Sequence, residues 1–357
     1  MKNSKLIGIR GPVIVTLALI TTCSSPVVTQ SLRADNGVSA SGAGTLVRKV
    51  RVTTAIQPLF PMGLVAKGAI NMNGNNILTD SFDSADPLHS TGGLYDASKR
   101  KANGDVATDS GLVNSVSVGN ANIYGEVHTG PSGSVSIGSN GSVGDLAWQT
   151  GGNSGIEPGF DKNDMNVTFP DVSAPVVGAF PPAGGNVGGT SYAYVLSGGS
   201  YQMSSFSLSG QSQVLVTGPS VLWVTGDVSM SGQASITIAP GGSLVMYVGT
   251  ASGSGNSASL GGGGVINNAG NAANFQFYGL PSLTSLSMSG NGTFTGTIYA
   301  PEADLTLNGG GSGNQDFSGA SVTKTVTLNG HFSFHFDENL MRIGPSRGWL
   351  ATNWQEK

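Results

Sequence analysis

Charged side chains are scarce in this sequence. Only 10% of the 357 residues are Asp, Glu, Lys or Arg, whereas soluble domains usually contain about 25%. The 16 Lys and Arg residues are scattered along the chain, and the net charge is −4. Neutralising a nucleic-acid backbone requires basic side chains gathered on one face. We therefore expect no nucleic-acid partner, and a surface made largely of Ser, Thr, Asn and Gly.

Cysteine and the common catalytic motifs are also missing. A single cysteine, Cys23, excludes an internal disulfide framework. No Gly-x-Ser-x-Gly sequence occurs, so the many serines lack the context of a serine hydrolase. The glycine runs at 261–264 and 309–311 are not followed by an amphipathic helix, whose N-terminus a phosphate site would use. The sequence therefore predicts neither a nucleotide nor another cofactor.

Glycine is abundant, with 56 residues, and it ends a series of short alternating segments. LSMSG, LTLNG and VTLNG end at Gly290, Gly309 and Gly330, which are 19 and 21 residues apart. FSLSG and VSMSG end in the same way at Gly210 and Gly232. A period near twenty, built of short strands broken by Gly, Asn and Ser, is typical of a β-solenoid. We predict an all-β fold, a parallel, right-handed β-helix whose coils have three faces.

The first residues have the pattern of a targeting segment. Lys2, Lys5 and Arg10 precede an apolar run from Pro12 to Thr22, which is too short to span a bilayer at about 20 residues. We expect residues 1–34 to hold a signal or anchor segment and the start of a linker. The protein should then be exported, to the cell envelope or the extracellular space. Cleavage, lipidation at Cys23 and retention as an anchor remain open.

The remaining chain divides by its strand pattern. We expect residues 35–114 to contain N-terminal strands, including a long one over 46–60, and polar loops that lead into the solenoid. The solenoid should occupy 115–340, with a Pro-rich irregular excursion at 145–189 between two blocks. Residues 341–357 leave the pattern and should cap the stack, because exposed apolar coil ends are unfavourable. Trp349 and Trp354 would be the large aromatics of this cap, or an exposed partner-binding pair.

Two groups of residues could bind a metal. On a strand, His331, Ser333, His335 and Asp337 would share one side and three phenylalanines the other. The two histidines would then lie about 13 Å apart, too far to share a zinc ion, so we interpret this side as solvated or coil-capping. An acidic loop supplies oxygen ligands that suit calcium, without the order of a known calcium loop. These weak candidates, which turn formation explains equally, are Asp80, Asp83 and Asp86; we assign no metal site.

Enzymatic and glycan-binding alternatives rest on few residues. Polysaccharide lyases and hydrolases built on β-helices need several carboxylates in one groove, yet Asp227 is the only charged residue between 192 and 270. The candidates left for such a site are Glu302, Asp304, Asp316 and Lys324. An adhesin that binds a glycan without cleaving it would use outward aromatic side chains. Its candidates are Tyr192, Tyr194, Tyr201 and Trp223.

Several longer segments resemble a known family. The segments are Phe294–Gly311, Asp316–Glu338, Asp164–Val172 and Leu215–Gly232. They are similar to a domain of unknown function in the C-terminal part of bacterial PilX-type pilus-assembly proteins. The resemblance implies an exported, envelope-associated β-solenoid without catalytic residues. Residue Gly11 is followed by Pro12 and no early Glu is present, unlike the start of pilin-like relatives. We therefore expect a non-catalytic structural or interaction module that binds a protein partner, a copy of itself or a surface glycan.

Overall fold

The computed structural model describes residues 28–32, 50–72, 74–178, 180–253, 255–290, 292–309 and 315–356. These residues form two units. The smaller one contains the described residues up to 57 and those from 346, and the larger one spans 58–345. The predicted segment 1–34 lies outside the described residues except for Val28–Leu32, and Cys23 is among those not described.

The smaller unit is a three-stranded sheet with the order β1 (Val28–Leu32), β2 (Val50–Pro58) and β31 (Ser346–Glu356). Strand β2 lies within the predicted segment 46–60 and runs antiparallel to β1. Strand β31 contains both C-terminal tryptophans, which are exposed. The prediction that residues 341–357 cap the solenoid is therefore wrong: 346–356 pair in a separate sheet, since β31 finds its backbone partners there.

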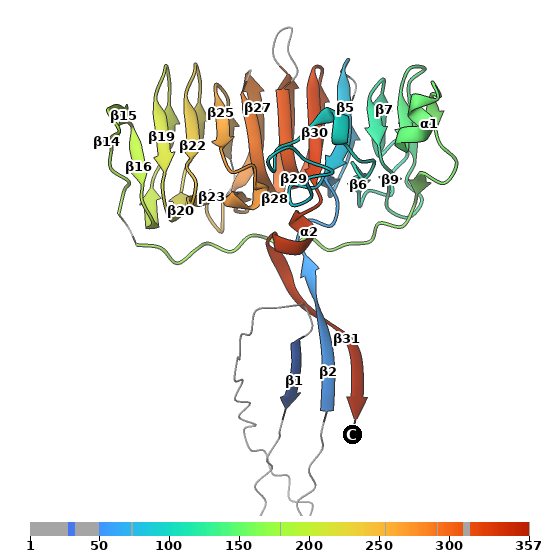
Figure 1. The fold of residues 1–357 in the computed structure, drawn as a ribbon, viewed down its shortest axis with the longest axis horizontal. Coiled ribbons are helices and arrows are strands. Elements are labelled where there is room, and N and C mark those ends of the chain that lie inside the picture. Colours follow the sequence, from blue (N-terminus) through green and yellow to red (C-terminus); the bar gives the residue numbers. More distant parts are fainter. Residues whose placement is uncertain are drawn as a thin grey trace, which may run out of the picture. The chain divides into compact units, whose positions relative to one another are not determined.

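The larger unit is a parallel β-solenoid, as the repeats predict (Figure 1). Each coil contributes one strand to each of three sheets. The strands of the repeat motif stack in one sheet, which we call the motif sheet: β18 (Phe206–Leu208), β21 (Val228–Met230), β24 (Asn256–Leu260), β27 (Leu283–Gly290), β28 (Thr293–Gly309), β29 (Gln315–Asn329), β4 (Ile70–Asn71), β7 (Val116–Gly119) and β10 (Val135–Ile137).

Two further sheets close the coils, and the long strands β28 and β29 bend through all three. The second sheet contains β16 (Tyr194–Leu196), β19 (Gln213–Val216), β22 (Ser235–Ile238), β25 (Gly264–Asn267), β28, β29, β30 (Phe332–Asp337), β5 (Ile77–Phe82), β8 (Asn122–Tyr124), β11 (Ser142–Gly144) and β12 (Gly155–Ile156). The third contains β17 (Gly199–Met203), β20 (Pro219–Val224), β23 (Ser243–Val248), β26 (Phe275–Gly279), β28, β29, β3 (Leu64–Ala66), β6 (Val106–Thr108), β9 (Val127–His128) and β13 (Asp161–Lys162).

Short elements complete the unit. They are the antiparallel pair β14 (Gly185–Val187) and β15 (Thr190–Tyr192), the helices α1 (Leu146–Thr150) and α2 (Leu340–Ile343), and the 3-10 turns η1 (Ala97–Lys99) and η2 (Ala272–Asn274). Helix α1 begins at Asp145, whose carboxylate accepts a hydrogen bond from the Trp148 N–H. This side-chain cap satisfies one backbone donor of the first turn.

The coils do not stack in sequence order. The first coil in the chain, β3 to β5, pairs on one side with β29 and β30 and on the other side with β6 to β8. The solenoid therefore starts at residue 64, not at 115 as predicted, and its first coil lies inside the stack. We call the contact between β3–β5 and β29–β30 the seam. At the seam the Leu59 N–H donates to the Pro345 carbonyl at 2.8 Å, so the chain enters and leaves the solenoid side by side.

The irregular excursion is shorter than predicted. Strands β12 and β13 still pair with β11 and β9. The long segment that leaves the coils comprises the described residues within 163–184, which we call the strap. The strap runs along the third sheet from one end of the stack to the other (Figure 1). That sheet has ten strands, about 43 Å across. The strap buries Met165, Phe169 and Val172 against it.

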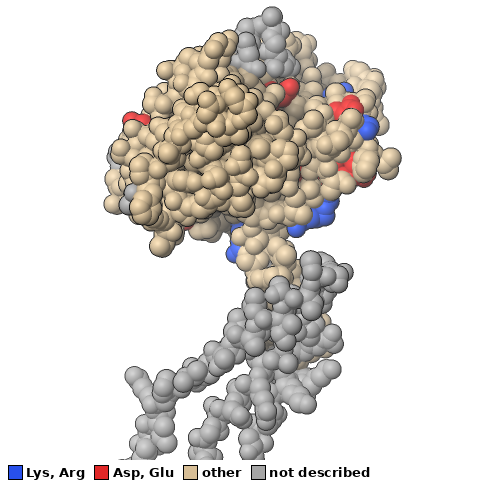
Figure 2. Space-filling view, turned by 60° about the vertical axis from the view of Figure 1, so that its left-hand side comes forward, with Lys and Arg blue, Asp and Glu red and all other residues tan. Residues whose placement is uncertain are grey.

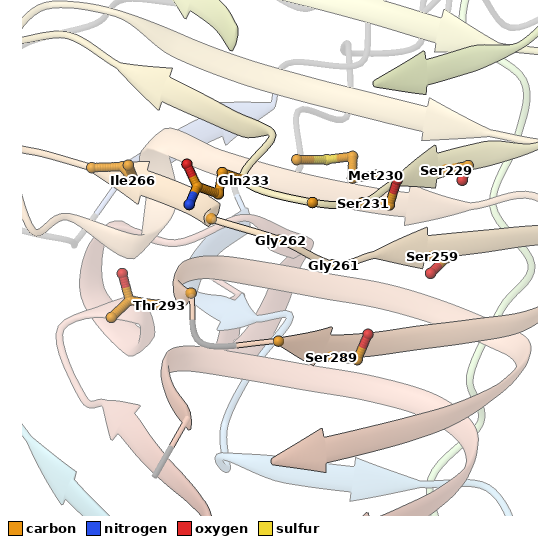
Figure 3. Close-up of a pocket in the computed structure, with 14 residues that line it drawn as sticks. Ser229, Met230, Ser231, Gln233, Ser259, Gly261, Gly262, Ile266, Ser289 and Thr293 are labelled. Carbon is orange, nitrogen blue, oxygen red and sulfur yellow. The ribbon is translucent and has the colours of Figure 1, made fainter. Parts of the chain in front are cut away.

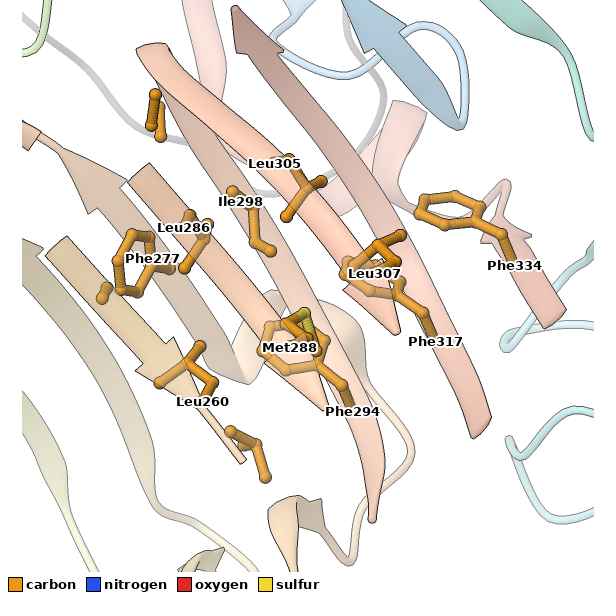
Figure 4. Packing of buried hydrophobic residues seen from close by; sticks show 14 of the residues in the cluster. Leu260, Phe277, Leu286, Met288, Phe294, Ile298, Leu305, Leu307, Phe317 and Phe334 are labelled. Carbon is orange, nitrogen blue, oxygen red and sulfur yellow. The ribbon is translucent and has the colours of Figure 1, made fainter. Parts of the chain in front are cut away.

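The core is a column of inward-facing side chains from successive coils (Figure 4). In the second sheet Phe294, Phe317 and Phe334 stack with ring centroids 4.6 and 4.5 Å apart. These residues occupy matching register positions on β28, β29 and β30. Each buried side chain of this size contributes roughly 1.5–3 kcal/mol, so stacking of coils stabilises segments that would not fold alone.

Candidate functional site

The motif sheet carries an uninterrupted row of small polar side chains on its outer surface. The row runs across nine coils and crosses the seam in register: Ser207, Ser229, Ser259, Ser287, Thr306, Thr327, Asn71, Ser117 and Ser136. None of these side chains is buried. We call this row the polar ladder. Its members are about 4.8 Å apart, the spacing of neighbouring strands.

A groove of ≈ 940 Å³ lies at one edge of the polar ladder (Figure 3). Its lining comes from β21, β24 and β27, the turns that follow them, and the next strands β25 and β28: Ser229, Met230, Ser231, Gly232, Gln233, Ser259, Gly261, Gly262, Gly263, Ile266, Ser289, Gly290, Gly292 and Thr293. Gly232 has a φ of +73°, and a Cβ there would lie 2.9 Å from the Gly210 nitrogen of the neighbouring turn. Glycine therefore allows these turns to stack closely, and the missing side chains leave the groove.

The groove can offer hydrogen bonds but no charge. Its polar groups are the Ser229, Ser231, Ser259, Ser289 and Thr293 hydroxyls, the Gln233 amide and backbone groups. General acid–base catalysis needs a titratable group whose pKa suits proton transfer, and the described lining residues include none. The chemistry of this site fits binding of a neutral polar surface or chain.

The second sheet buries a charged cluster at the seam. Asp80 on β5 and His335 on β30 are register partners, and the Asp80 Oδ1 lies 2.5 Å from the His335 Nδ1. The Tyr95 hydroxyl donates to Asp80 Oδ2 at 2.6 Å, and its ring stacks on the imidazole with centroids 3.5 Å apart. Asp316 Oδ1 lies 3.6 Å from the His335 Nε2. His335 therefore bridges two carboxylates on neighbouring coils.

Three more ion pairs cross the seam in the same way. Lys101 pairs with Glu338, Lys67 with Glu302, and Arg342 Nη2 lies 2.5 Å from Asp83 Oδ1. Every one joins residues that are more than 230 positions apart in the chain. Much of the little charge in the solenoid thus lies where its first and last coils meet.

Burial and charge act in opposite directions on the seam histidine. Burial lowers the pKa of His335, but the negative charges of Asp316 and Asp80 and the hydrogen bond to Asp80 outweigh it, so its pKa lies above the usual 6.5. Burial also raises the pKa of the neighbouring Asp337 and of the Tyr95 hydroxyl. The cluster therefore favours an imidazolium between carboxylates, which is an internal ion pair.

The histidines lie differently from our expectation. His335 is buried, not solvated, because the loop 83–103 covers it and places Tyr95 on its ring. The alternation itself is as predicted, since Phe332 and Phe334 face the core. His331 lies before β30 with a φ of +50° and its Nδ1 is 3.3 Å from the Asn76 amide. The two histidines have separate partners.

The three acidic loop residues also separate. Asp80 contacts His335, Asp83 contacts Arg342, and Asp86 accepts from the Leu88 N–H of its own turn at 2.9 Å. Among the residues that the structure describes, no group of three or more His, Cys, Asp or Glu side chains is placed to hold a metal ion. The structure therefore gives these carboxylates structural partners in place of a shared cation.

The other acidic candidates are likewise dispersed over the coils. Glu302 pairs with Lys67. Asp304 accepts from the Thr325 hydroxyl at 2.7 Å and lies 3.8 Å from Lys324. Asp316 belongs to the His335 cluster. The structure does not bring these residues into one groove.

A second charged cluster, which the sequence did not indicate, lies near the end of the stack that contains β13. His128 Nδ1 is 2.7 Å from Asp164 and its Nε2 is 3.2 Å from Glu126, which also pairs with Lys162 at 2.5 Å. The hydrogen bond from His128 lowers the pKa of Asp164, and burial raises the pKa of Asp105, which accepts from the Glu126 N–H. Here strands β6, β9 and β13 bring together residues that are distant in sequence.

The outer surface of the third sheet carries an aromatic row, only one member of which was a candidate. Trp223, Tyr247, Tyr278 and Tyr299 are successive register partners. The strap covers part of this row: Tyr299 is buried and donates to the Pro170 carbonyl at 2.8 Å, and Tyr247 and Tyr278 pack against the same cluster. The other predicted glycan contacts are elsewhere: Tyr194 and Tyr201 pack against the core, and Tyr192 ends β15.

Together these features define a three-sided parallel β-solenoid in which four ion pairs join the first and last coils. Residues 182–343 match a family described as a domain of unknown function (DUF7305). The matched segment extends from the end of the strap through β30 to α2 and covers less than half of the chain. Comparisons with curated proteins and with solved structures gave no match. Within the described residues, no helix is long and apolar enough to cross a membrane.

Proposed function

We propose that this protein is a non-catalytic, exported module that serves a structural or interaction role in the cell envelope or in a pilus-like assembly. The polar ladder carries the proposal. Nine neutral side chains in register on a stack of coils form a long, regular surface that offers hydrogen bonds without charge. Such a surface suits a protein partner, a second copy or a surface glycan.

The way in which the chain enters the solenoid supports this role. Because Leu59 and Pro345 are hydrogen-bonded at the seam, the chain enters and leaves the coil stack within it and not at either end of the stack. In a solenoid each repeat contacts only its neighbours, so the repeats form a long stack that presents an extended binding surface. The resemblance of the C-terminal segments to PilX-type proteins supports placing the module in pilus-like assembly, and the basic and apolar start of the sequence supports export.

Cell fractionation combined with mass spectrometry of the mature chain tests the proposal. We expect the protein in the envelope or the medium, with residues 1–22 or more removed, or with a lipid on Cys23. An unprocessed chain in the cytosol would overturn the compartment and with it the envelope role.

A polysaccharide-active enzyme is the second candidate, and the cluster of Glu126, His128 and Asp164 is the observation that favours it. A lyase or hydrolase needs carboxylates that face the sugar, and here Glu126 and Asp164 are partly exposed beside a histidine. Incubation with bacterial surface polysaccharides, with a Glu126→Gln variant as control, separates the candidates. The structural role predicts no new chain ends from either protein, whereas wild-type cleavage that is lost in the variant would establish the enzyme.

A further inference from the structure

One end of the solenoid is free of charge over a long stretch of chain. Between Asp171 and Asp227 the sequence contains no Asp, Glu, Lys, Arg or His. This stretch forms the end of the strap, the pair β14–β15 and the first complete coil of the C-terminal block, β16 to β18, which we call the uncharged end. Figure 2 looks toward this side of the molecule and shows a broad surface without charged side chains. Such a surface offers nothing to a charged partner.

The uncharged end is incompletely covered. The Ala183 carbonyl accepts from the Val195 N–H and the Phe180 carbonyl accepts from the Gln202 N–H, both at 2.9 Å. Each bond occupies one backbone donor on the outer edge of β16 or β17. Strand β18, in contrast, pairs only with β21 among the described strands. One edge of the motif sheet is therefore open.

The open edge has a defined hydrogen-bonding pattern. Phe206 donates its N–H to Asp227, and Leu208 accepts from Ser231, so these two residues bond to the next coil. In a parallel ladder the residue between them directs its N–H and carbonyl the other way. Ser207 therefore presents one donor and one acceptor at the end of the stack.

The uncharged end also exposes apolar side chains. Phe180 is 74% exposed and Val187 of β14 is 41% exposed. The first coil also leaves Tyr194, Tyr201 and Met203 only partly buried, although they pack against the core. Native proteins usually protect an open edge with charged side chains or proline. This edge has no charge to protect it.

The opposite end of the stack differs. There helix α1 and the charged residues Asp145, Glu157, Asp161 and Lys162 lie beside the last strands. Pairing of the uncharged end with that end of another copy would desolvate these charges without giving them partners, which is costly. Two uncharged ends can meet without this cost.

We propose that the uncharged end binds the same end of a second copy of this chain. Two β18 strands pair antiparallel about a twofold axis, with the Ser207 N–H of each copy donating to the Ser207 carbonyl of the other. Directly opposed residues of an antiparallel pair point to the same face, so the two polar ladders join into one. The closed, isologous geometry gives a dimer and no open filament.

The seam provides a precedent within the chain for such an end-to-end contact. There, coils that are far apart in sequence meet edge to edge, with six consecutive register pairs between β30 and β5. The proposal rests on the proposed function in that it names a second copy as the partner. Association in solution can nevertheless be measured without knowing the compartment, so the two can fail separately.

Sedimentation equilibrium of the purified full chain tests the proposal, with two variants of the uncharged end and one control. We expect the wild type to sediment at twice the mass of one chain. Phe180→Lys places a charge in the contact, and Ser207→Pro removes an N–H that the coil itself does not use. Each should weaken dimerisation at least about tenfold, while Leu112→Lys, which changes a 73% exposed residue beside β10 at the opposite end, should not.

The results separate the alternatives clearly. Circular dichroism confirms that each variant is folded, and Phe180→Lys alone suffices if Ser207→Pro disturbs its strand. A monomeric wild type, or a dimer that both end variants leave intact, would refute the proposal. Open-ended oligomers that Leu112→Lys abolishes would show head-to-tail stacking in place of the twofold contact.

Discussion

The ion pair between Asp80 and His335 allows a quantitative test of the seam. Both side chains are at most 3% exposed, so removing one partner leaves a buried charge without compensation, which typically costs about 3–5 kcal/mol. We therefore expect His335→Phe to lower the free energy of unfolding by this amount, although phenylalanine retains the stacking with Tyr95. The double variant Asp80→Leu/His335→Phe removes both charges and should be much closer to the wild type.

The cost of His335→Phe should also depend on pH, with a defined sign. The pKa of His335 is raised in the folded protein, so its contribution is fully present below the unfolded pKa of about 6.5 and is lost as the pH rises through the folded value. Urea unfolding followed by circular dichroism, from about pH 5.5 to about pH 9, measures this difference. The difference in the free energy of unfolding between the wild type and His335→Phe should decrease as the pH increases.

The location of the effect distinguishes a seam from an ordinary buried pair. Hydrogen exchange should show faster opening of residues 64–144 in His335→Phe, because in a solenoid each coil is stabilised by its neighbours. Three results would refute this reasoning: a loss of unfolding free energy below about 1 kcal/mol in His335→Phe, a difference from the wild type that grows with pH, or hydrogen exchange that is equally faster throughout the chain.

Three further predictions concern single positions. Gly319→Ala should destabilise the protein more than Gly241→Ala. Both glycines have a φ between +80° and +150°, but only at 319 would a Cβ lie 1.8 Å from a backbone oxygen, that of Gly296. Thermal unfolding compares the two variants, and equal losses of stability would contradict the predicted clash. Phe317→Ala should cost about 3–5 kcal/mol by removing the middle ring of a stack, whereas Phe317→Leu should cost less in the same assay. Calcium should not raise the melting temperature, since Asp80, Asp83 and Asp86 contact separate partners; a rise that Asp83→Asn abolishes would contradict this assignment.

The sequence contained enough information to predict the coil but not the order of the coils. The repeat motif and its period place Leu286, Leu305 and Val326 in register on neighbouring strands of one sheet, because alternation and glycine spacing are local properties. The stacking order is not local. Since AINMNG near residue 70 has the same pattern as the C-terminal motifs, it fits beside β29 as well as beside β7. Nothing within twenty residues distinguishes these positions.

The candidate site was predictable to the same degree. The outward Ser, Thr and Asn of the motif follow from the period of two in a strand, so the polar ladder could have been read from the sequence once the motifs were aligned. The sequence indicates both Asp80 and His335 as candidates, but as members of different groups. Their contact depends on β5 lying beside β30, which is a consequence of the stacking order.

The position of the charged residues suggests how the chain selects one order among similar ones. Coils with nearly the same motif can pair in many combinations, and their hydrophobic burial differs little between them. At the seam, however, a wrong pairing would bury Asp80 or His335 without its partner, and an unpaired buried charge costs far more than one exchanged leucine. Four ion pairs join residues before 102 to residues after 301. The buried ones, above all Asp80–His335, therefore penalise other arrangements more than they stabilise this one. On this argument, the buried charges at the seam specify which coils meet.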